Sequence, residues 1–369
     1  MKVAIIHYWL ITRRGGEKVV ESILKVYPEA DIYTLFLDQE TYGDNLPKNR
    51  IYTSILNNGF LRKHYQKMFP LYPFGIRSLK LKDKYDLIIS SESGPAKGIQ
   101  IKDNTPHLCY IHSPMRYCWG FTDEYLRSMP KVARPLAKFF FKRLRNWDKT
   151  TIGNVTHYIA NSQNVAQRVE RYYGEKASVL YPPIDLGLFE KPLKTDAHKD
   201  IYLSFGAITP YKRIDLLVDA FNENGKPLVV IGAGSEKEKL LKKARPNIKF
   251  MGSLAWEEIE TFLYRTKALL FPGEEDFGMI PLEVMAYGIP VLAYKKGGAL
   301  ETIVESDEIE KSSGLFFKEQ TVESVQDCID KFEEVEDRFD PNWIRSHARK
   351  FGEDVFIEKF KAKAAEFYD

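Results

Sequence analysis

The chain has 369 residues, of which 44% are hydrophobic and 28% are charged. At roughly 150 residues per domain this length predicts two domains, and so much apolar surface excludes a disordered chain. Three cysteines without a Cys-x-x-Cys pair exclude a disulfide framework and a structural zinc site, and they favour a reducing, cytoplasmic location. No apolar run approaches the ~18 residues of a membrane-spanning helix. Residues 3–11 are interpreted as a strand and its loop, not as a signal peptide, because Arg13 and Arg14 close them without a cleavage site.

The net charge of +3 is unevenly distributed along the chain. Residues 1–185 carry 28 Lys and Arg against 17 Asp and Glu, whereas the remainder carries 26 against 34. A basic first half indicates an anionic partner such as phosphate, membrane lipid or nucleic acid. The acidic second half argues against a wrapped polyanion, so nucleic acid is not expected to be the partner.

Short apolar runs alternate with helical patterns along the chain. Buried strands are predicted at Val3–His7, Asp31–Phe36, Asp86–Ser90, His107–Ile111, Val155–Ala160, Ile201–Phe205, Pro227–Ile231, Ile248–Met251, Ala268–Phe271 and Pro290–Ala293. Helices are predicted at Glu17–Tyr27, Ile214–Asn222, Trp256–Arg265, Val322–Val335 and Glu353–Tyr368. This alternation predicts an α/β fold in which helices cover both faces of parallel sheets. Two such units fit the length better than one sheet, and the join is placed at Tyr181–Asp185, where two prolines stiffen the chain.

Two loops in the first half are candidates for ligand binding, because ligands of open α/β sheets sit beyond the carboxyl ends of strands. Gly15 and Gly16 open a helix, where backbone N–H groups can approach a phosphate. The alternative for this pair is a flexible turn. His112 directly follows a strand and is expected to face a cleft, with Arg116 nearby. The alternative for His112 is a structural histidine.

Two loops in the second half carry charged candidates. Lys212 and Arg213 stand where a helix begins, against the preference of the helix dipole, which argues for an anion such as phosphate between these cations and the helix. A solvated basic pair is the alternative. Glu275 falls in the loop before the helix expected to begin at about Pro281, and Glu283 falls near its first turn; such carboxylates can accept hydrogen bonds from sugar hydroxyls. Their alternative role is to complement the helix dipole.

Two other signatures are rejected. Gly232-Ala233-Gly234 follows a strand as in dinucleotide folds, but position 237 is Lys and no acid near residue 251 could hold a ribose. No Asp-x-Asp occurs, so a metal bridging a diphosphate is not expected and cations of the protein should serve instead. We therefore expect neither a metal nor another cofactor.

Aromatic and basic residues are concentrated in the same two segments. Phe60–Tyr85 and Lys131–Lys149 each hold seven Lys and Arg, interleaved with aromatic residues. This composition fits a helix on an anionic membrane surface. Nucleic-acid binding is the competing interpretation, and an ordinary solvated helix is the third.

An ordered set of short motifs resembles the family 4 glycosyltransferases, which are retaining enzymes of GT-B fold. The motifs are Gly15-Gly16-Glu17, Asn161-Ser162, Tyr181–Asp185, Pro210–Arg213, Glu275-x7-Glu283, Gly288–Val291 and Gly297-Gly298 with Glu301. The resemblance implies two Rossmann-like domains that face each other across a cleft. Residues 1–182 would bind the acceptor, 183–349 would bind the nucleotide-sugar, and a helix at about 350–369 would pack back on the first domain.

The resemblance also implies site roles. His112 and Glu275 would be catalytic and position the transferred sugar, and Glu283 would hold the ribose. The other donor-binding residues would be Gly15, Gly16, Lys212, Arg213, Phe277, Gly278, Met279 and Ile280, and the acceptor or sugar would contact Arg116, Tyr117, Asn161 and Ser162. One departure is Ala207, because the family usually carries Arg directly after this glycine. Either Arg213 compensates or the diphosphate is held differently.

The segment His112–Tyr117 with Trp119 further resembles mannosyltransferases that use GDP-mannose in surface polysaccharide assembly, of the kind that builds lipopolysaccharide O-antigen. The resulting expectation is a retaining, metal-independent transfer of mannose to a lipid-linked or polysaccharide acceptor. The protein would be cytoplasmic and peripheral on the inner face of the membrane. The alternatives are a UDP-sugar-dependent enzyme of the same family, a phosphorylase or sugar-phosphate synthase, and a non-catalytic nucleotide-sugar-binding module.

Overall fold

A computed structural model describes residues 1–42, 45–127, 129–193 and 198–368. The chain divides into two compact units. Unit 1 comprises Met1–Pro183 with Glu353–Asp369, and unit 2 comprises Ile184–Gly352. The units therefore divide after residues 183 and 352, whereas the sequence led us to expect divisions after residues 182 and 349.

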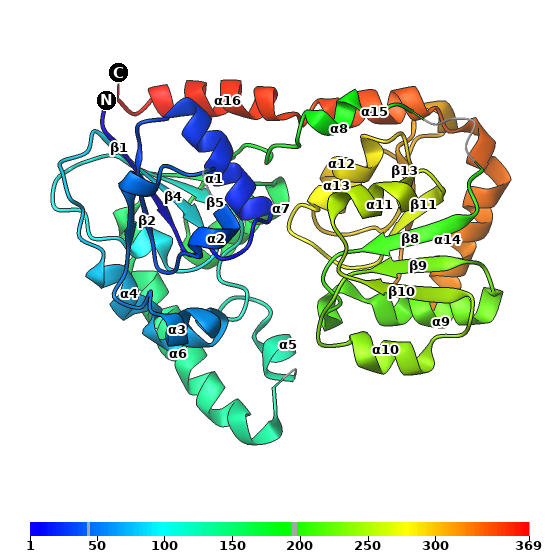
Figure 1. The fold of residues 1–369 in the computed structure, drawn as a ribbon, viewed down its shortest axis with the longest axis horizontal. Helices are drawn as coiled ribbons and strands as arrows, with labels where there is room; N and C mark the ends of the chain where they lie inside the picture. Colours follow the sequence, from blue (N-terminus) through cyan, green and yellow to red (C-terminus); the bar gives the residue numbers. More distant parts are fainter. Residues whose placement is uncertain (43–44, 128, 194–197, 369) are drawn as a thin grey trace. The chain divides into compact units, whose positions relative to one another are not determined.

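Unit 1 is built on a parallel sheet whose described strands lie in the order β3-β2-β1-β4-β5-β6-β7 (Figure 1). The strands are β1 (Val3–His7), β2 (Asp31–Thr34), β3 (Ile51–Thr53), β4 (Leu87–Glu92), β5 (His107–Ile111), β6 (His157–Ala160) and β7 (Ala177–Val179). The α-helices are α1 (Gly15–Val26), α2 (Gln39–Tyr42), α3 (Gly59–Lys63), α4 (Tyr72–Ser78), α5 (Thr122–Arg127), α6 (Arg134–Thr150), α7 (Gln163–Tyr173) and α16 (Glu353–Ala365).

The continuous apolar runs of this sheet arise because both of its faces are buried. In β1, Val3 and Ile5 belong to the core cluster formed with α1 and α16, whereas Ala4 and Ile6 belong to the cluster formed with α4. Successive residues of a strand point to opposite faces, so helices cover this sheet on both sides. The predicted α/β class with parallel sheets is confirmed.

The last helix of the chain belongs to unit 1. Phe356 and Phe360 of α16 are buried in one core cluster with Val19 of α1 and Ile5 of β1. Figure 1 shows α16 lying across one end of α1. The C-terminal segment thus completes the covering layer on this face of the first sheet.

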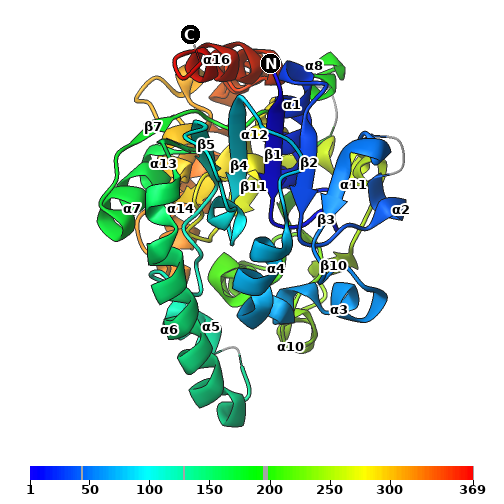
Figure 2. The same cartoon turned by 90° about the vertical axis from the view of Figure 1, so that its left-hand side faces the viewer.

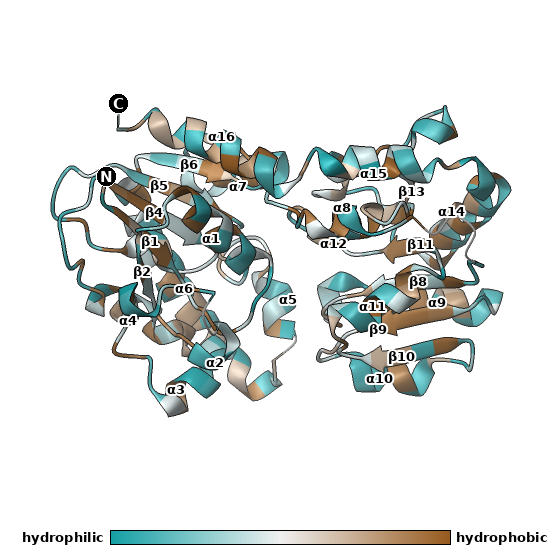
Figure 3. Cartoon of the chain, turned by 45° about the horizontal axis from the view of Figure 1, so that its top comes forward, coloured by the Kyte–Doolittle hydropathy of each residue, from teal (hydrophilic) through white to brown (hydrophobic). Residues whose placement is uncertain are grey.

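Unit 2 repeats the architecture, with its described strands in the order β10-β9-β8-β11-β12-β13. The strands are β8 (Ile201–Phe205), β9 (Leu228–Ile231), β10 (Ile248–Gly252), β11 (Thr266–Phe271), β12 (Val291–Tyr294) and β13 (Gly314–Phe317). The α-helices are α8 (Gly187–Glu190), α9 (Ile214–Asn224), α10 (Lys237–Lys243), α11 (Trp256–Leu263), α12 (Met279–Met285), α13 (Ala299–Thr302), α14 (Val322–Val335) and α15 (Pro341–Arg349). Figure 3 shows hydrophobic residues concentrated in the strands and hydrophilic residues on outer helices such as α10.

In each unit the strand order reverses once. In unit 1, β2 and β3 follow β1 on one side of it, whereas β4 and the later strands of the sheet lie on its other side. In unit 2 the same reversal of strand order lies between β8 and β11. Loops that leave the two strands at such a switch point diverge and leave a crevice at the carboxyl ends. Among the described residues, no helix is long and apolar enough to cross a membrane.

Candidate functional site

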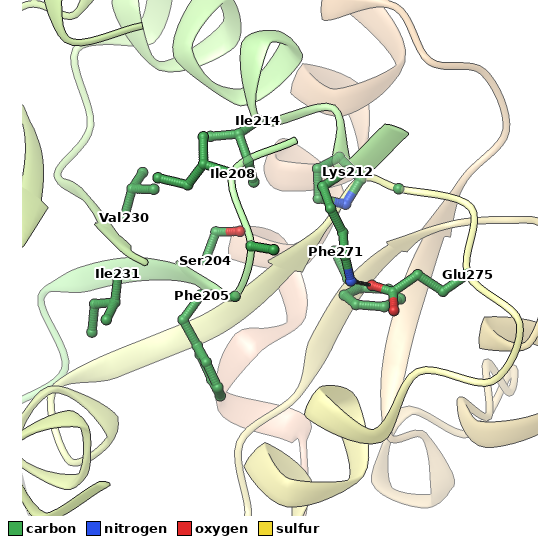
Figure 4. Close-up of a pocket in the computed structure, with 13 residues that line it drawn as sticks. Ser204, Phe205, Ile208, Lys212, Ile214, Val230, Ile231, Phe271 and Glu275 are labelled. Atoms are coloured by element: carbon green, nitrogen blue, oxygen red, sulfur yellow. Dashed lines mark hydrogen bonds and ion pairs between the residues drawn. The ribbon is translucent and has the colours of Figure 1, made fainter. Parts of the chain in front are cut away.

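A pocket lies at the carboxyl ends of β8 and β11, at the switch point of the second sheet. Its wall combines the loop after β8, the loop after β11 and parts of β9, and we call it the unit 2 pocket (Figure 4). The lining residues are Ser204, Phe205, Gly206, Ala207, Ile208, Lys212, Ile214, Val230, Ile231, Phe271, Pro272, Gly273 and Glu275. Most of this lining is apolar, and its charges come from Lys212 and Glu275.

Lys212 and Glu275 are brought together by the fold. Their side chains point toward each other from the two loops and form an ion pair (Figure 4). Both are largely shielded from solvent, with side-chain exposures of 14% and 18%. The Lys212 ammonium also lies 5.8 Å from the centre of the Phe271 ring. A ligand phosphate that binds Lys212 would therefore compete with a carboxylate already in place.

Arg213 does not line the pocket. Its backbone adopts a left-handed conformation (φ 55°) where α9 begins. Its Nε donates to Asp215 at 3.1 Å and its Nη1 donates to Gln320 at 3.1 Å. Asp215, in the first turn of α9, therefore balances part of the charge of Arg213, and a role for Arg213 in donor binding stays a prediction.

Ala207 lies in the pocket wall, at the position where the resemblance led us to expect an arginine. The neighbouring glycines serve close backbone contacts. A Cβ on Gly232 would lie 1.8 Å from the carbonyl oxygen of Gly206, and a Cβ on Gly234 would lie 2.1 Å from that of Ile208. The Gly232-Ala233-Gly234 pattern is therefore explained by close packing of the loop after β9 against the loop after β8. A dinucleotide site is not needed to account for it.

The loop that carries Glu275 is supported from behind by two glycines. The N–H of Gly298 donates to the carbonyl of Glu275 at 2.8 Å. A Cβ on Gly298 would lie 2.2 Å from the Cα of Phe277, and a Cβ on Gly297 would lie 2.4 Å from the carbonyl oxygen of Glu275. Only glycine fits both positions without displacing this loop.

The helix after this loop begins earlier than predicted. Gly278 precedes α12 with φ 86°, so Met279 and not Pro281 is the first helical residue. Glu283 is consequently in the second turn, where the residue is buried, with 8% exposure. Ile280 approaches the loop after β8, because a Cβ on Gly206 would lie 3.1 Å from its Cδ1. Phe277 is buried.

In unit 1 the fold brings Gly16 and His112 together at the switch point beside β1 and β4. Gly15 and Gly16 are the first residues of α1. A Cβ on Gly16 would lie 3.5 Å from Nε2 of His112 and 3.0 Å from the hydroxyl oxygen of Tyr8. A glycine here thus keeps space open in front of the His112 ring.

His112 is held by two partners from the end of β4. Its Nε2 is hydrogen-bonded to the hydroxyl of Ser91 at 2.8 Å, and its backbone N–H donates to the carbonyl of Glu92 at 2.8 Å. Beside it, the ring of His7 is fully buried and neither nitrogen has a hydrogen-bond partner among the described residues. Ser91 and His7 were not among the predicted site residues. Their position at the ends of β4 and β1 is the signal in the sequence that could have identified them.

The remaining predicted residues have local contacts of their own. The Arg116 guanidinium lies 5.0 Å from the centre of the Phe121 ring, and the Tyr117 hydroxyl donates to the sulfur of Met115 at 3.3 Å. Ser162 directly precedes α7 and caps it, because its hydroxyl oxygen accepts a hydrogen bond from the N–H of Val165 at 3.0 Å. Asn161 accepts a hydrogen bond from the Ser162 hydroxyl at 3.2 Å.

A buried charge cluster behind His112 was also missed. Lys97 is fully buried and forms an ion pair with Asp148 of α6, and its N–H donates to Glu92 at 2.8 Å. Trp119 and Tyr173 donate to the same Asp148 carboxylate at 2.8 and 3.0 Å. Burial raises the pKa of Glu92 to about 7. The cluster ties the loop after β5 to β4 and α6, which fixes the surroundings of His112.

Two family models match consecutive parts of the chain. Glycosyltransferase Family 4 matches residues 13–188, and Glycosyl transferases group 1 matches residues 188–351. An uncharacterized glycosyltransferase of Methanocaldococcus jannaschii is 25% identical over 83% of this chain and 83% of its own length. The O-antigen chain mannosyltransferase C of Escherichia coli is 21% identical over 90% and 87%. The alpha-1,3/1,6-mannosyltransferase ALG2 of Saccharomyces cerevisiae is 24% identical over 72% of this chain and 60% of its own length.

Solved structures share the fold. Anabaena HepE, crystallised in complex with UDP, is matched over 99% of this chain and all of the solved chain, with a TM-score of 0.69 at 18% identity. Sucrose-phosphate synthase of Thermosynechococcus elongatus is matched over 100% of this chain and 99% of its own, with a TM-score of 0.71 at 16% identity.

Proposed function

The chain belongs to the family 4 glycosyltransferases, and from this premise we propose that it transfers mannose from GDP-mannose to a lipid-linked or polysaccharide acceptor. Mannose is supported by relatives from Escherichia coli and yeast that are named mannosyltransferases. The surface-polysaccharide acceptor is supported by the bacterial relative, whose name refers to the O-antigen chain. The proposed location is the inner face of the cytoplasmic membrane.

The observation that carries the proposal is the Lys212–Glu275 pair in the wall of the unit 2 pocket. A diphosphate at the carboxyl ends of parallel strands needs a nearby cation, and a sugar needs a nearby hydrogen-bond acceptor. Lys212 would bind the diphosphate and stabilise the charge of the leaving nucleotide. Glu275, released from Lys212, would accept hydrogen bonds from the hydroxyls of the transferred sugar. The sugar-positioning role expected of His112 remains part of the proposal. Glu283 would hold the ribose.

The proposed mechanism is a front-face substitution with retention of configuration. The acceptor hydroxyl oxygen bonds to the anomeric carbon on the face from which the nucleoside diphosphate leaves. The bond between that carbon and the diphosphate oxygen breaks, and its electron pair goes to the diphosphate. A diphosphate oxygen takes the hydroxyl proton. Trapping a covalent glycosyl-enzyme on any side chain would overturn this mechanism.

The test is calorimetric titration with GDP, UDP and ADP, each with and without magnesium. Selective binding of GDP that does not change with magnesium supports a metal-independent GDP-sugar transferase. Mannose transfer from GDP-mannose to a lipid-linked acceptor, with the product anomer assigned by NMR, then completes the test. If no nucleotide binds, the proposal fails, and a phosphorylase, which needs no nucleotide-sugar, becomes the better account.

A UDP-sugar donor is the second candidate. It is favoured by Anabaena HepE, which was crystallised with UDP, with UDP and glucose, and with UDP-glucose. Preference for UDP in the same titration would keep the family and discard mannose from GDP-mannose.

A further inference from the structure

Unit 1 contains a further cavity, and none of its lining residues is among those assigned to the donor, the sugar or the acceptor. It lies between α4 with the turn before it and α6, and its lining residues are Pro70, Pro73, Arg77, Phe140, Arg143, Leu144 and Trp147. We call it the α4–α6 groove. Figure 2 shows α6 projecting away from the sheet beyond α4, so that its first turns stand apart from the core.

The two arginines of the groove are uncommitted. Arg77 and Arg143 are exposed, and neither has a hydrogen-bond or ion-pair partner in the described part of the chain. Other arginines of α6 are engaged: Arg145 donates to the Thr122 hydroxyl at 3.1 Å, and Arg134 donates to the Met129 carbonyl at 3.1 Å. Two free guanidinium groups on one groove create a site for an anion, and no side chain in the described part of the chain supplies that anion.

No carboxylate competes for that site along the neighbouring sequence. Residues 45–82 contain no Asp or Glu, and the one acid in 131–149 is Asp148, which is buried against Lys97. Planar guanidinium groups match phosphate oxygens better than any other side chain does. The charge and geometry therefore favour a phosphate group.

The surroundings of the groove are apolar. Within α6, positions 136, 140, 143 and 147 follow the three- and four-residue spacing of one helix face, which combines Leu136, Phe140 and Trp147 with Arg143. The large hydrophobic side chains exposed on these segments are Leu71, Phe74, Val132, Leu136 and Phe139. Exposed apolar side chains beside cations are typical of surfaces that enter the headgroup region of a membrane.

We propose that the α4–α6 groove binds the headgroup phosphate of an anionic phospholipid in a bilayer. Arg77 and Arg143 hold the phosphate oxygens, and Leu136, Phe139 and Phe74 enter the acyl boundary. This inference rests on the proposed function, since it gives an enzyme with a lipid-linked acceptor its contact with the membrane. Nucleic acid fits less well, because three of the five exposed apolar side chains, Leu71, Val132 and Leu136, are aliphatic and offer no face for base stacking, whereas all five match acyl chains.

The experiment measures co-sedimentation of the full-length protein with vesicles of phosphatidylglycerol mixed with phosphatidylcholine, at low salt. The test variant is Arg77→Gln/Arg143→Gln. The matched control is Lys138→Gln/Lys142→Gln, which removes the same charge from exposed positions of α6 outside the groove. Two general surface charges account for about a 25-fold loss of partitioning. We expect that loss for the control and about 100-fold for the groove variant, since the phosphate also loses its two fixed hydrogen-bonding partners.

Equal losses in the two variants would overturn the proposal, because they would show general electrostatics without a site. Binding of wild-type protein to pure phosphatidylcholine vesicles as strongly as to the mixture would also overturn it, as would binding to a mixed-sequence RNA oligonucleotide in preference to vesicles. Soluble glycerol phosphate should not compete, since the proposed ligand is a lipid in a bilayer.

A second measurement stays informative if the arginine variant fails to fold. Trp147 lines the groove, so phospholipids brominated near the headgroup should quench protein fluorescence, and Trp147→Phe should remove most of that quenching. Quenching that persists unchanged in Trp147→Phe would contradict the placement of the lipid. The nucleotide titration is independent of both measurements. Vesicle binding without nucleotide binding would contradict the proposed function and support the lipid site in the groove. Nucleotide binding without vesicle binding would support the proposed function and contradict the lipid site.

Discussion

At the scale of single residues, Lys212 and Glu275 neutralise each other in the wall of the unit 2 pocket. Glu275→Gln removes the competing carboxylate, so nucleoside diphosphate should bind at least as tightly as to wild type. Lys212→Met should weaken that binding by about 10- to 100-fold, the value of hydrogen bonds to a charged group. Both variants should lose about 100-fold or more in transfer rate. Calorimetry and initial rates measure the two effects separately.

Lys226→Met is the control for this pair. Lys226 forms a comparable, partly shielded ion pair with Glu333 in the same unit, but neither residue lines the pocket. Its nucleotide affinity and transfer rate should match those of wild type. If Glu275→Gln weakened nucleotide binding as much as Lys212→Met does, the idea that the carboxylate and the diphosphate compete for Lys212 would be wrong.

Ser91 acts through His112 and is a positioning residue. Ser91→Ala removes the 2.8 Å hydrogen bond that orients the His112 ring. We expect kcat to fall about tenfold with little change in the KM for donor, because a misoriented ring affects positioning of the reacting sugar more than binding. Ser90→Ala is the matched control, since Ser90 makes the same 2.8 Å bond to the buried His107. Each variant should lose about 1 kcal/mol of stability, but only Ser91→Ala should lower kcat.

Glu92 should make stability depend on pH. Burial raises its pKa to about 7 in the folded protein, above the value of about 4.3 in an unfolded chain. The folded state therefore favours the neutral carboxyl. The associated stability is fully present below about pH 4.3 and is lost as pH rises to about 7, a change of about 3 kcal/mol.

Glu92→Gln tests this dependence. The variant keeps a neutral side chain at every pH, so its free energy of unfolding relative to wild type should rise by about 3 kcal/mol between about pH 4.3 and 7. His107, whose pKa burial lowers to about 4, titrates in both proteins and cancels in the difference. Denaturant unfolding at a series of pH values measures it. Parallel curves for the two proteins would show that Glu92 is already ionised in the fold.

At the scale of elements, the loop after β11 depends on the glycines that follow β12. Gly298→Ala would put a Cβ 2.2 Å from the backbone of Phe277, and that backbone cannot yield without moving Glu275. We expect a loss of about 1–3 kcal/mol in stability and at least a tenfold loss of transfer. Gly153→Ala is the control, because a Cβ there meets nothing within 4 Å. Wild-type transfer by Gly298→Ala would mean that the loop adapts.

Central strands and the five-residue edge strand β10 were predictable from the sequence, whereas the three shorter edge strands were not. β1, β5 and β8 were predicted with their observed bounds because a strand buried on both faces is a continuous apolar run. β3, β7 and β13 were missed. They lie at the sheet edges and span three or four residues each, so they carry little of that signal.

The candidate site was likewise predictable in part: its loops could be located from the sequence, but the contacts between their side chains could not. The loops holding Lys212 and Glu275 follow predictable strands, and glycine and charge patterns drew attention to them. The pairing of those two side chains, the Ser91–His112 bond and the burial of Lys97 join residues that are distant in the chain. Such contacts depend on how strands are ordered within the sheet, which spacing along one sequence does not encode.

At the scale of the whole molecule, charge and proposed function are divided between the units. The excess of basic residues falls in residues 1–185, which include the α4–α6 groove, whereas the nucleotide is assigned to unit 2, where acidic residues predominate. Each unit has its own parallel sheet. We therefore expect two thermal transitions in scanning calorimetry, one for each unit.

Ligand and mutation should then act on different transitions. GDP at about 100 times its Kd contributes about 2.7 kcal/mol, which should raise the Tm of unit 2 by about 5–10 °C. Phe360→Ala in α16 removes a buried ring from the core of unit 1, at a cost of about 3–5 kcal/mol, and should lower the Tm of unit 1 by about 10 °C. Although Phe360 follows all of unit 2 in the chain, the GDP-sensitive transition should not move. A single transition that responds to both changes would show that the two units unfold together, and α16 would then couple them.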